Sequence, residues 1–172
     1  MKKSMLLAAI MLGVSMPASA GSSGAKGFAA ALADPARPEK DRARDATRKP
    51  AELLAFARVK RGQKVADYIM GGGYLTQILA SAVGAKGLVY AYQPIEFVTY
   101  RAAYGTEQDA VAAARANVKP LRSLIADFAL PEQADVIITV QNFHDLYLKP
   151  MPPGTPEKGI AALYAALKPG GT

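Results

Sequence analysis

Residues 65–76 read Val-Ala-Asp-Tyr-Ile-Met-Gly-Gly-Gly-Tyr-Leu-Thr. A short apolar run ends in an acid, breaks into three consecutive glycines and continues as a helix-compatible segment, residues 74–83. The order strand, glycine loop, helix is typical of the first βα turn in a nucleotide-binding α/β sheet. Glycines suit this turn because a Cβ obstructs its backbone angles and its close approach to a ligand. The N-terminus of the helix then presents unpaired N–H groups to that ligand.

The rest of the chain alternates apolar strand patterns with helical patterns. Such alternation predicts a parallel sheet with right-handed crossovers, that is, an α/β Rossmann-like three-layer sandwich with a mostly parallel sheet. Two helices precede the first strand in this interpretation. We expect further strands at residues 87–92, 120–127 and 134–140, and helices at residues 38–49, 50–59, 74–82, 106–118 and 157–167.

The glycine stretch resembles motif I of the class I S-adenosylmethionine-dependent methyltransferases, D-x-G-x-G-x-G. Asp67 matches the acid of the motif, and Gly71 and Gly73 match its last two glycines. Ile69 stands where the first glycine normally is. The resemblance implies S-adenosyl-L-methionine as cofactor and methyl transfer as the activity.

Three later segments extend the resemblance over roughly residues 37–172. Residues 83–91 read Val-Gly-Ala-Lys-Gly-Leu-Val-Tyr-Ala, and residues 142–145 read Asn-Phe-His-Asp. Residues 167–171, Leu-Lys-Pro-Gly-Gly, look like the turn before the fifth methyltransferase strand. The ordered set is similar to a group of exported bacterial predicted methyltransferases.

The resemblance implies a cofactor site along the carboxyl ends of the strands. Its glycine loop contains Gly72 between the two motif glycines, although a tight turn without a ligand is the alternative. Gln93 stands where the family places an Asp or Glu that accepts hydrogen bonds from both ribose hydroxyls, and it is as readily a loop residue; Glu96 is a possible substitute. Asp127 is implied at the adenine amino group, with a solvated loop acid as the alternative.

Residues 142–145 follow the fourth strand, where many methyltransferases keep groups that orient the substrate or accept a proton. His144 is the only histidine and a candidate general base, with Asp145 as its acid partner. Neighbouring residues seldom point the same way, which argues against this dyad. Asn142 is the third candidate catalytic residue, and loop capping is the alternative for Asn142 and Asp145.

The N-terminus has the three parts of a secretory signal peptide in order. Lys2 and Lys3 are basic, residues 5–16 are apolar, and residues 17–20, Pro-Ala-Ser-Ala, supply a small-x-small cleavage site. We therefore expect a signal peptide at residues 1–20, a flexible leader at residues 21–36 and the methyltransferase domain at residues 37–172. The mature protein would be periplasmic or secreted, without a stable membrane anchor.

Composition limits the chemistry and the partners. The chain has no cysteine, which excludes disulfides, thiolate metal ligands and a cysteine nucleophile, and we expect no metal. The net charge is +7, but residues 37–61 mix both signs, which is typical of a solvated surface and not of a nucleic-acid site. We expect a small-molecule or otherwise unidentified methyl acceptor.

The chain reaches Thr172 where a fifth strand would begin, so we expect a C-terminally truncated domain with an unpaired edge on the fourth strand. Two functions stay open: an exported methyltransferase, and a non-catalytic exported binding protein that keeps the cofactor fold. A nicotinamide-dependent oxidoreductase is disfavoured by Thr76 at the third glycine position and by the missing ribose acid.

Overall fold

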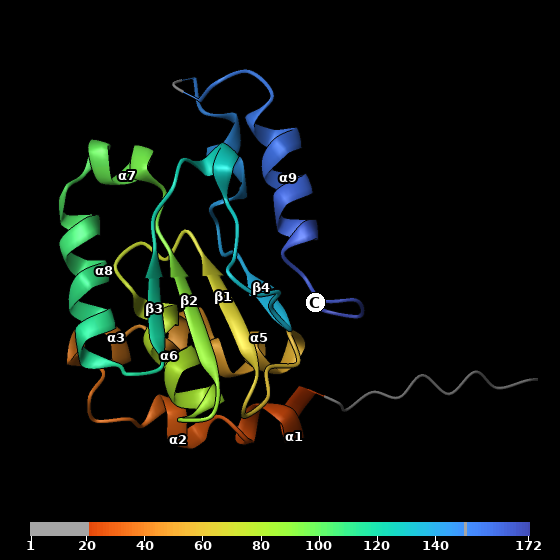
Figure 1. The fold of residues 1–172 in the computed structure, drawn as a ribbon. Coiled ribbons are helices and arrows are strands. Elements are labelled where there is room, and N and C mark those ends of the chain that lie inside the picture. Colours follow the sequence, from red (N-terminus) through yellow and green to blue (C-terminus); the bar gives the residue numbers. More distant parts are fainter. Residues whose placement is uncertain (1–20, 150) are drawn as a thin grey trace, which may run out of the picture.

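The computed structural model describes residues 21–149 and 151–172, so the expected signal peptide lies outside the described residues. Its centre is one sheet of parallel strands in the order β3-β2-β1-β4 (Figure 1). β1 pairs with β2 from Lys64 opposite Leu88 to Tyr68 opposite Tyr92. This arrangement confirms the expected Rossmann-like α/β class. The strands are β1 (Lys64–Tyr68), β2 (Leu88–Tyr92), β3 (Val118–Leu121) and β4 (Val136–Ile138).

Helices cover both faces of the sheet (Figure 1). None of the helices in the described part of the chain is long and apolar enough to cross a membrane. The α-helices are α1 (Gly21–Lys26), α2 (Ala29–Leu32), α3 (Glu39–Arg42), α4 (Asp45–Arg48), α5 (Pro50–Phe56), α6 (Tyr74–Val83), α7 (Ile95–Tyr100), α8 (Ala103–Ala114) and α9 (Thr155–Ala165), and the 3₁₀ turns are η1 (Ile125–Asp127) and η2 (Phe143–Tyr147).

Each face of the sheet has its own core, because successive strand residues point to opposite faces. On one face, strand residues such as Val65 and Val89 pack with buried residues of α2, α5, α6 and α8. On the other face, the aromatic rings of Tyr68, Tyr92 and Phe128 lie together, with ring centroids 4.7–5.2 Å apart. α9 covers this aromatic cluster through Ala162 and Leu163.

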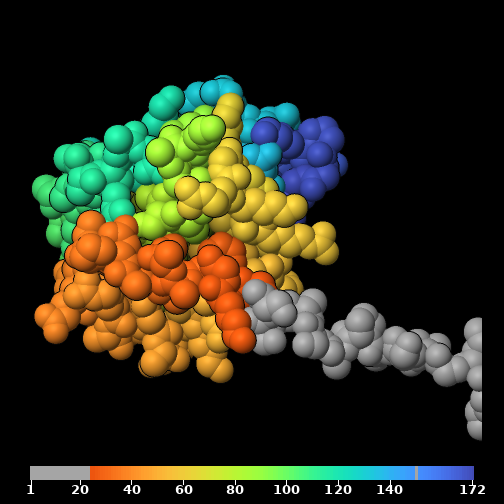
Figure 2. Space-filling model, turned by 90° about the horizontal axis from the view of Figure 1, so that it is seen from below, coloured from red at the N-terminus to blue at the C-terminus, as the bar shows by residue number. Residues whose placement is uncertain are grey.

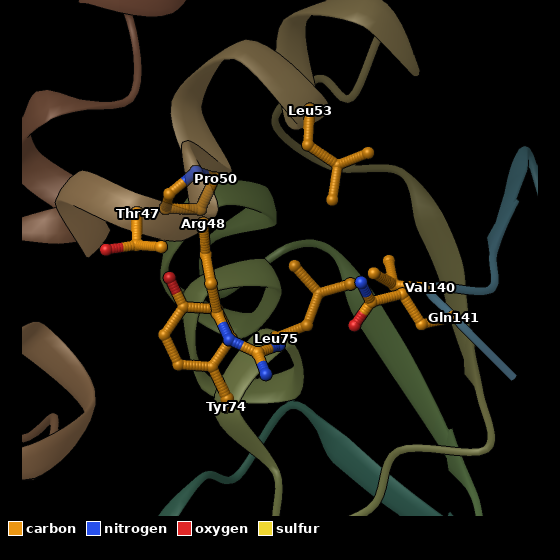
Figure 3. Close-up of a pocket in the computed structure, with 8 residues that line it drawn as sticks. All are labelled: Thr47, Arg48, Pro50, Leu53, Tyr74, Leu75, Val140 and Gln141. Atoms are coloured by element: carbon orange, nitrogen blue, oxygen red, sulfur yellow. The ribbon is translucent and has the colours of Figure 1, made fainter. Parts of the chain in front are cut away.

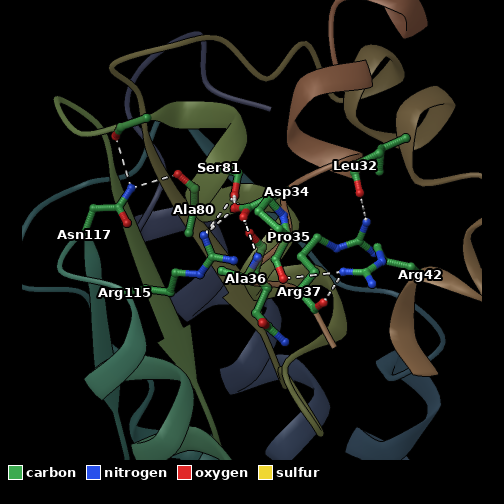
Figure 4. Close-up of polar contacts among 12 residues, drawn as sticks. Leu32, Asp34, Pro35, Ala36, Arg37, Arg42, Ala80, Ser81, Arg115 and Asn117 are labelled. Atoms are coloured by element: carbon green, nitrogen blue, oxygen red, sulfur yellow. Dashed lines mark hydrogen bonds and ion pairs between the residues drawn. The ribbon is translucent and has the colours of Figure 1, made fainter. Parts of the chain in front are cut away.

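The N-terminal segment packs against the domain, so the expectation of a flexible leader at residues 21–36 was wrong. α1 lies against α5 and α2 against α6, and Ala31 is buried in the core. The Asp34 carboxylate accepts hydrogen bonds from the Ser81 hydroxyl of α6 and, at 2.6 Å, from Arg115 (Figure 4). These hydrogen bonds hold the pKa of Asp34 down, at about 2. Seen from below, the N-terminal residues, in red and orange, cover a large part of the visible face (Figure 2).

Several expected boundaries also differ from the structure. The polar helix expected at residues 38–49 is two short helices, α3 and α4. The strand expected at residues 120–127 begins earlier, at Val118 opposite Val89, and gives way to η1. The helix expected to reach residue 118 ends at Ala114. Beyond it, the Asn117 side chain points toward the end of α6 and donates to the carbonyl groups of Ala80 and Gly84 (Figure 4). The helix α7 was not predicted.

The outer edge of β4 is partly paired, which corrects the expectation of an unpaired edge. The Thr172 N–H donates to the Asp135 carbonyl at 3.1 Å, and the Ile137 N–H donates to the Thr172 carbonyl at 2.8 Å. A parallel bridge between Ala134 and Leu167 precedes this pairing. The last residues therefore pair with the outer edge of β4 in the parallel sense.

We expect Gly87→Ala to destabilise the fold. A Cβ at Gly87 would lie 2.5 Å from the Val83 Cβ and 2.9 Å from the Gln63 carbonyl oxygen, so α6 and β2 would have to separate. Overpacking of this kind costs about 1–3 kcal/mol, measurable by urea denaturation. The neighbouring exposed residue provides the control, since Lys86→Ala should change the free energy of unfolding by less than about 0.5 kcal/mol. Equal stability of both variants would contradict the close packing at Gly87.

Candidate functional site

A cavity of about 260 Å³ lies at the carboxyl ends of β1 and β4. The chain runs from β1 outward through β2 and β3 and then returns to β4, so this is the point where the strand order reverses, the usual ligand site of open α/β sheets. The cavity is lined by residues from four segments. They are Asp67 of β1 with Ile69, Met70, Gly71 and Gly72 of the loop after it, Tyr74 and Leu75 of α6, Val140, Gln141 and Asn142 after β4, and Arg44 and Arg48 around α4.

The glycines of the loop are required for different reasons. Gly71 has φ +57° and Gly73 has φ +82°, a region that other residues seldom adopt. A Cβ at Gly73 would also lie 2.7 Å from the Val111 Cγ2 of α8, whereas a Cβ at Gly71 would meet nothing within 4 Å. Gly73 is therefore fixed by packing, and Gly71 borders open space beside the cavity.

Two non-glycine residues at the site also have a left-handed backbone. Ile69 has φ +64° and Gln141 has φ +60°, which costs roughly 1–2 kcal/mol per residue. The Asn142 side chain fixes one of them, since its Nδ2 donates to the Ile69 carbonyl at 2.8 Å. Asn142, a candidate catalytic residue, thus lines the cavity and holds the ends of β1 and β4 together.

Asp67 is buried, with 4% of its surface exposed, and it lines the cavity. The Thr76 hydroxyl donates to its Oδ2 at 2.6 Å. Burial raises the pKa of Asp67 to about 6, against the lowering by the hydrogen bonds from Thr76. Thr76, read from the sequence only as a departure from the dinucleotide motif, is the direct partner of this carboxyl.

The residues predicted for the ribose and the adenine do not line this cavity. Gln93 is fully buried (0% exposed), and its Oε1 accepts the Gly71 N–H at 3.0 Å, while its Nε2 has no partner among the described residues. The Glu96 carboxylate accepts the Ile125 N–H of η1 at 3.0 Å. Asp127 is exposed in η1. The glycine loop and Gln93 are in contact, and Asp127 lies apart from them in its own turn.

The other two candidate catalytic residues lie in η2, outside the cavity lining. The His144 side chain is 73% exposed, and its Nε2 lies 3.2 Å from the Asp145 Oδ1. The adjacent side chains therefore do meet, contrary to the sequence argument against a dyad. Within the described residues, Asn142 is the one member of the predicted catalytic group that the structure brings to the glycine loop.

Arg44 and Arg48 were missed as site residues. Tyr74 is the first residue of α6, and the guanidinium carbons of Arg44 and Arg48 lie 5.0 Å and 5.1 Å from the centre of its ring. The Tyr74 hydroxyl donates to the Asp45 Oδ1 at 2.8 Å, and Asp45 pairs with the buried Arg37. The sequence indicated them only through the many basic residues in the segment 37–61. Because that segment also contains acidic residues, it was interpreted as a solvated surface.

A second cavity of about 340 Å³ shares Arg48, Tyr74, Leu75, Val140 and Gln141 with the first. In Figure 3, Arg48 extends alongside the Tyr74 ring, and Leu53 and Val140 come from the other sides. Thr47, Pro50 and Leu53 complete the lining. The two cavities therefore adjoin across the start of α6.

Comparisons with known proteins find similar folds but no matching sequence family. No family model matches the chain, and no curated protein matches it. An S-adenosylmethionine-dependent O-methyltransferase from Thermotoga maritima is similar in structure, with a TM-score of 0.53 and 22% identity over 72% of this chain and 41% of that one. A TehB-like methyltransferase from Corynebacterium glutamicum has a TM-score of 0.51 and 18% identity over 69% of this chain and 56% of that one.

The glycopeptide N-methyltransferase MtfA in complex with S-adenosyl-L-homocysteine is also similar, with a TM-score of 0.51 and 20% identity over 71% of this chain and 45% of that one. The chain thus spans about half the length of these methyltransferases. At these identities the likeness defines a shared fold: this protein has the Rossmann-like fold of the S-adenosylmethionine-dependent methyltransferases.

We expect the ionisation of Asp67 to lower the free energy of unfolding as the pH rises from about 4 to about 6. The folded pKa of about 6 lies above the ordinary value of 3.8, so the folded state holds a proton that the unfolded state has lost. The stabilisation is complete below about pH 4 and lost above about pH 6, roughly 2–3 kcal/mol in all.

Urea denaturation of the wild type and Asp67→Asn between pH 4 and pH 7.5 measures this effect. The variant should match the wild type near pH 4 and exceed its stability at pH 7.5. Thr76→Val, which removes the hydroxyl that donates to the carboxylate, should raise the pKa further and steepen the loss. Parallel pH profiles for all three proteins would contradict a raised pKa at Asp67.

Proposed function

We propose that this protein binds S-adenosyl-L-methionine and transfers its methyl group to a small acceptor. The observation that supports this most is the composition of the cavity between β1 and β4. There the glycine loop, the buried Asp67 and the cation Arg44 converge at the strand-order reversal of a methyltransferase fold. The acceptor of MtfA is a glycopeptide, so acceptors differ widely on this fold, and the acceptor of this chain is unidentified.

The residues present fit the cofactor. Arg44 carries the charge that complements a ligand carboxylate, and it lines the same cavity as Gly71 and Gly72. The Nε2 of Gln93 is a buried donor without a partner among the described residues, as expected for a group that meets a ligand hydroxyl. Gln93 can turn to such a hydroxyl only by releasing the Gly71 N–H.

The chain's own residues have modest chemical tasks in this proposal. When bound, S-adenosylmethionine supplies a methyl group on a good leaving group. The protein aligns the acceptor and excludes water. Asn142 fixes the loop through the Ile69 carbonyl, and Asp67 holds the start of α6 through Thr76. Neither task needs a strong general base, in keeping with a cavity that His144 does not line.

Export is the second part of the proposal. We propose that residues 1–20 direct the chain out of the cytoplasm, on the ordered basic, apolar and small-residue regions. The competing function, a non-catalytic binding protein, is favoured by one observation, the Gln93 side chain that closes on the Gly71 N–H. Binding without turnover in the assays below would favour that alternative.

We expect Gly71→Ala to weaken S-adenosylhomocysteine binding by tenfold or more while the protein stays folded. A Cβ at Gly71 meets no protein atom within 4 Å, so the methyl group would enter the space where the ligand approaches the backbone. Gly62→Ala is a matched control, since Gly62 also has a positive φ, +82°, and open space around its Cβ, and lies away from the cavity. Titration calorimetry with S-adenosylhomocysteine and NAD measures the binding. Preference for NAD, or equal affinities of both variants, would overturn the proposal.

We expect His144→Ala to lower the methylation rate by less than about threefold. The side chain is exposed and lines neither cavity, so we expect it not to contact an acceptor held there. Single-turnover assays with a methyl-labelled cofactor and candidate acceptors provide the rate. A general base contributes about 100-fold or more, so a loss of that size would restore His144 as the base.

A further inference from the structure

We propose that the second cavity, between α4, α5 and the end of β4, is an acceptor pocket for a small carboxylate with an apolar body, and that Arg48 holds the carboxylate. The role of this pocket as an acceptor site rests on the proposed methyl transfer. The anion site itself stands on the geometry of the cavity alone.

The cavity has the size and the surface for an apolar body. Its volume is about 340 Å³, and Pro50, Leu53, Leu75 and Val140 form its apolar walls. A dry apolar cavity of about 150 Å³ already takes up benzene, so a single aromatic ring fits here with room for a polar substituent. The cavity adjoins the glycine-loop cavity across Tyr74 and Leu75, where an acceptor has to lie.

The polar part of the lining points to an anion. Arg48 is the one charged residue among the described residues of the lining, and no carboxylate lines the cavity. In the described part of the chain its guanidinium has no hydrogen-bond or ion-pair partner and lies over the Tyr74 ring at 5.1 Å (Figure 3). A guanidinium held on an aromatic face keeps its planar set of donors available, which suits bidentate binding of a carboxylate.

The neighbouring cations differ from Arg48 in this respect. Arg37 is fully buried and pairs with Asp45, and Arg44 lies 3.3 Å from the Asp41 Oδ1. Arg44 lines only the glycine-loop cavity, beside the proposed cofactor. Among these three cations Arg48 alone lines both cavities, so a carboxylate that it holds in the second cavity lies next to the glycine-loop cavity.

Titration with benzoate and its neutral analogue benzamide, followed by NMR, tests the pocket. We expect benzoate to shift the amide resonances of Leu53, Leu75 and Val140 and to bind at least tenfold more tightly than benzamide. Arg48→Gln should weaken benzoate binding about tenfold or more and leave benzamide binding unchanged, and Arg48→Lys should restore part of it. Lys49→Gln removes a charge from the exposed residue next to Arg48 and should change the affinity by less than about twofold.

Two further measurements distinguish failure of this proposal from failure of the proposed function. Saturating S-adenosylhomocysteine should leave the benzoate affinity within about threefold, and Arg44→Gln should do the same. Displacement of benzoate by S-adenosylhomocysteine, a loss in Arg44→Gln in place of Arg48→Gln, or equal affinities for benzoate and benzamide would overturn the acceptor pocket. A protein that binds benzoate through Arg48 but no S-adenosylhomocysteine would keep the anion pocket and refute the methyltransferase.

Discussion

The buried ion pair between Arg37 and Asp45 holds the N-terminal segment on the first helix after the glycine loop. Arg37 is fully buried and donates to both Asp45 carboxylate oxygens, at 2.7 Å and 2.8 Å, and to the Leu32 carbonyl. The Tyr74 hydroxyl donates to the same carboxylate, which joins α4 to the first residue of α6. The pair lowers the pKa of Asp45 and keeps it ionised. Arg44 and Arg48, which flank or end α4, lie over the ring of the same Tyr74.

The site is assembled from segments far apart in the sequence, and its backbone is strained where two of them meet. Ile69 and Gln141, which follow β1 and β4, both have a left-handed backbone that their side chains disfavour. The hydrogen bond from Asn142 to the Ile69 carbonyl keeps this arrangement in place. Strain of this kind persists only where the surroundings fix it, so the parallel pairing of β1 with β4 and this one amide act together.

The sequence predicted the central strands and the glycine loop because both leave a local pattern, an apolar run and a cluster of residues without a Cβ. It did not predict where the third strand begins, since Pro120 looked like a strand start and the pairing of Val118 with Val89 is a tertiary contact. It placed Asn142 in the site by its position after a strand. Arg48 escaped notice because its neighbours in sequence are charged, and only the packing of α4 against Tyr74 makes it a cavity residue.

The hydrogen bond between the Gly71 N–H and Gln93 has a thermodynamic consequence for any nucleoside that uses the end of β2. The protein has to populate a form in which this bond is broken before the Gln93 Oε1 or the loop N–H is available. A net hydrogen-bond contribution of about 1 kcal/mol means that roughly one molecule in six is in that form. The apparent dissociation constant rises by the inverse of that fraction. The same hydrogen bond fixes the Gln93 side chain against the glycine loop.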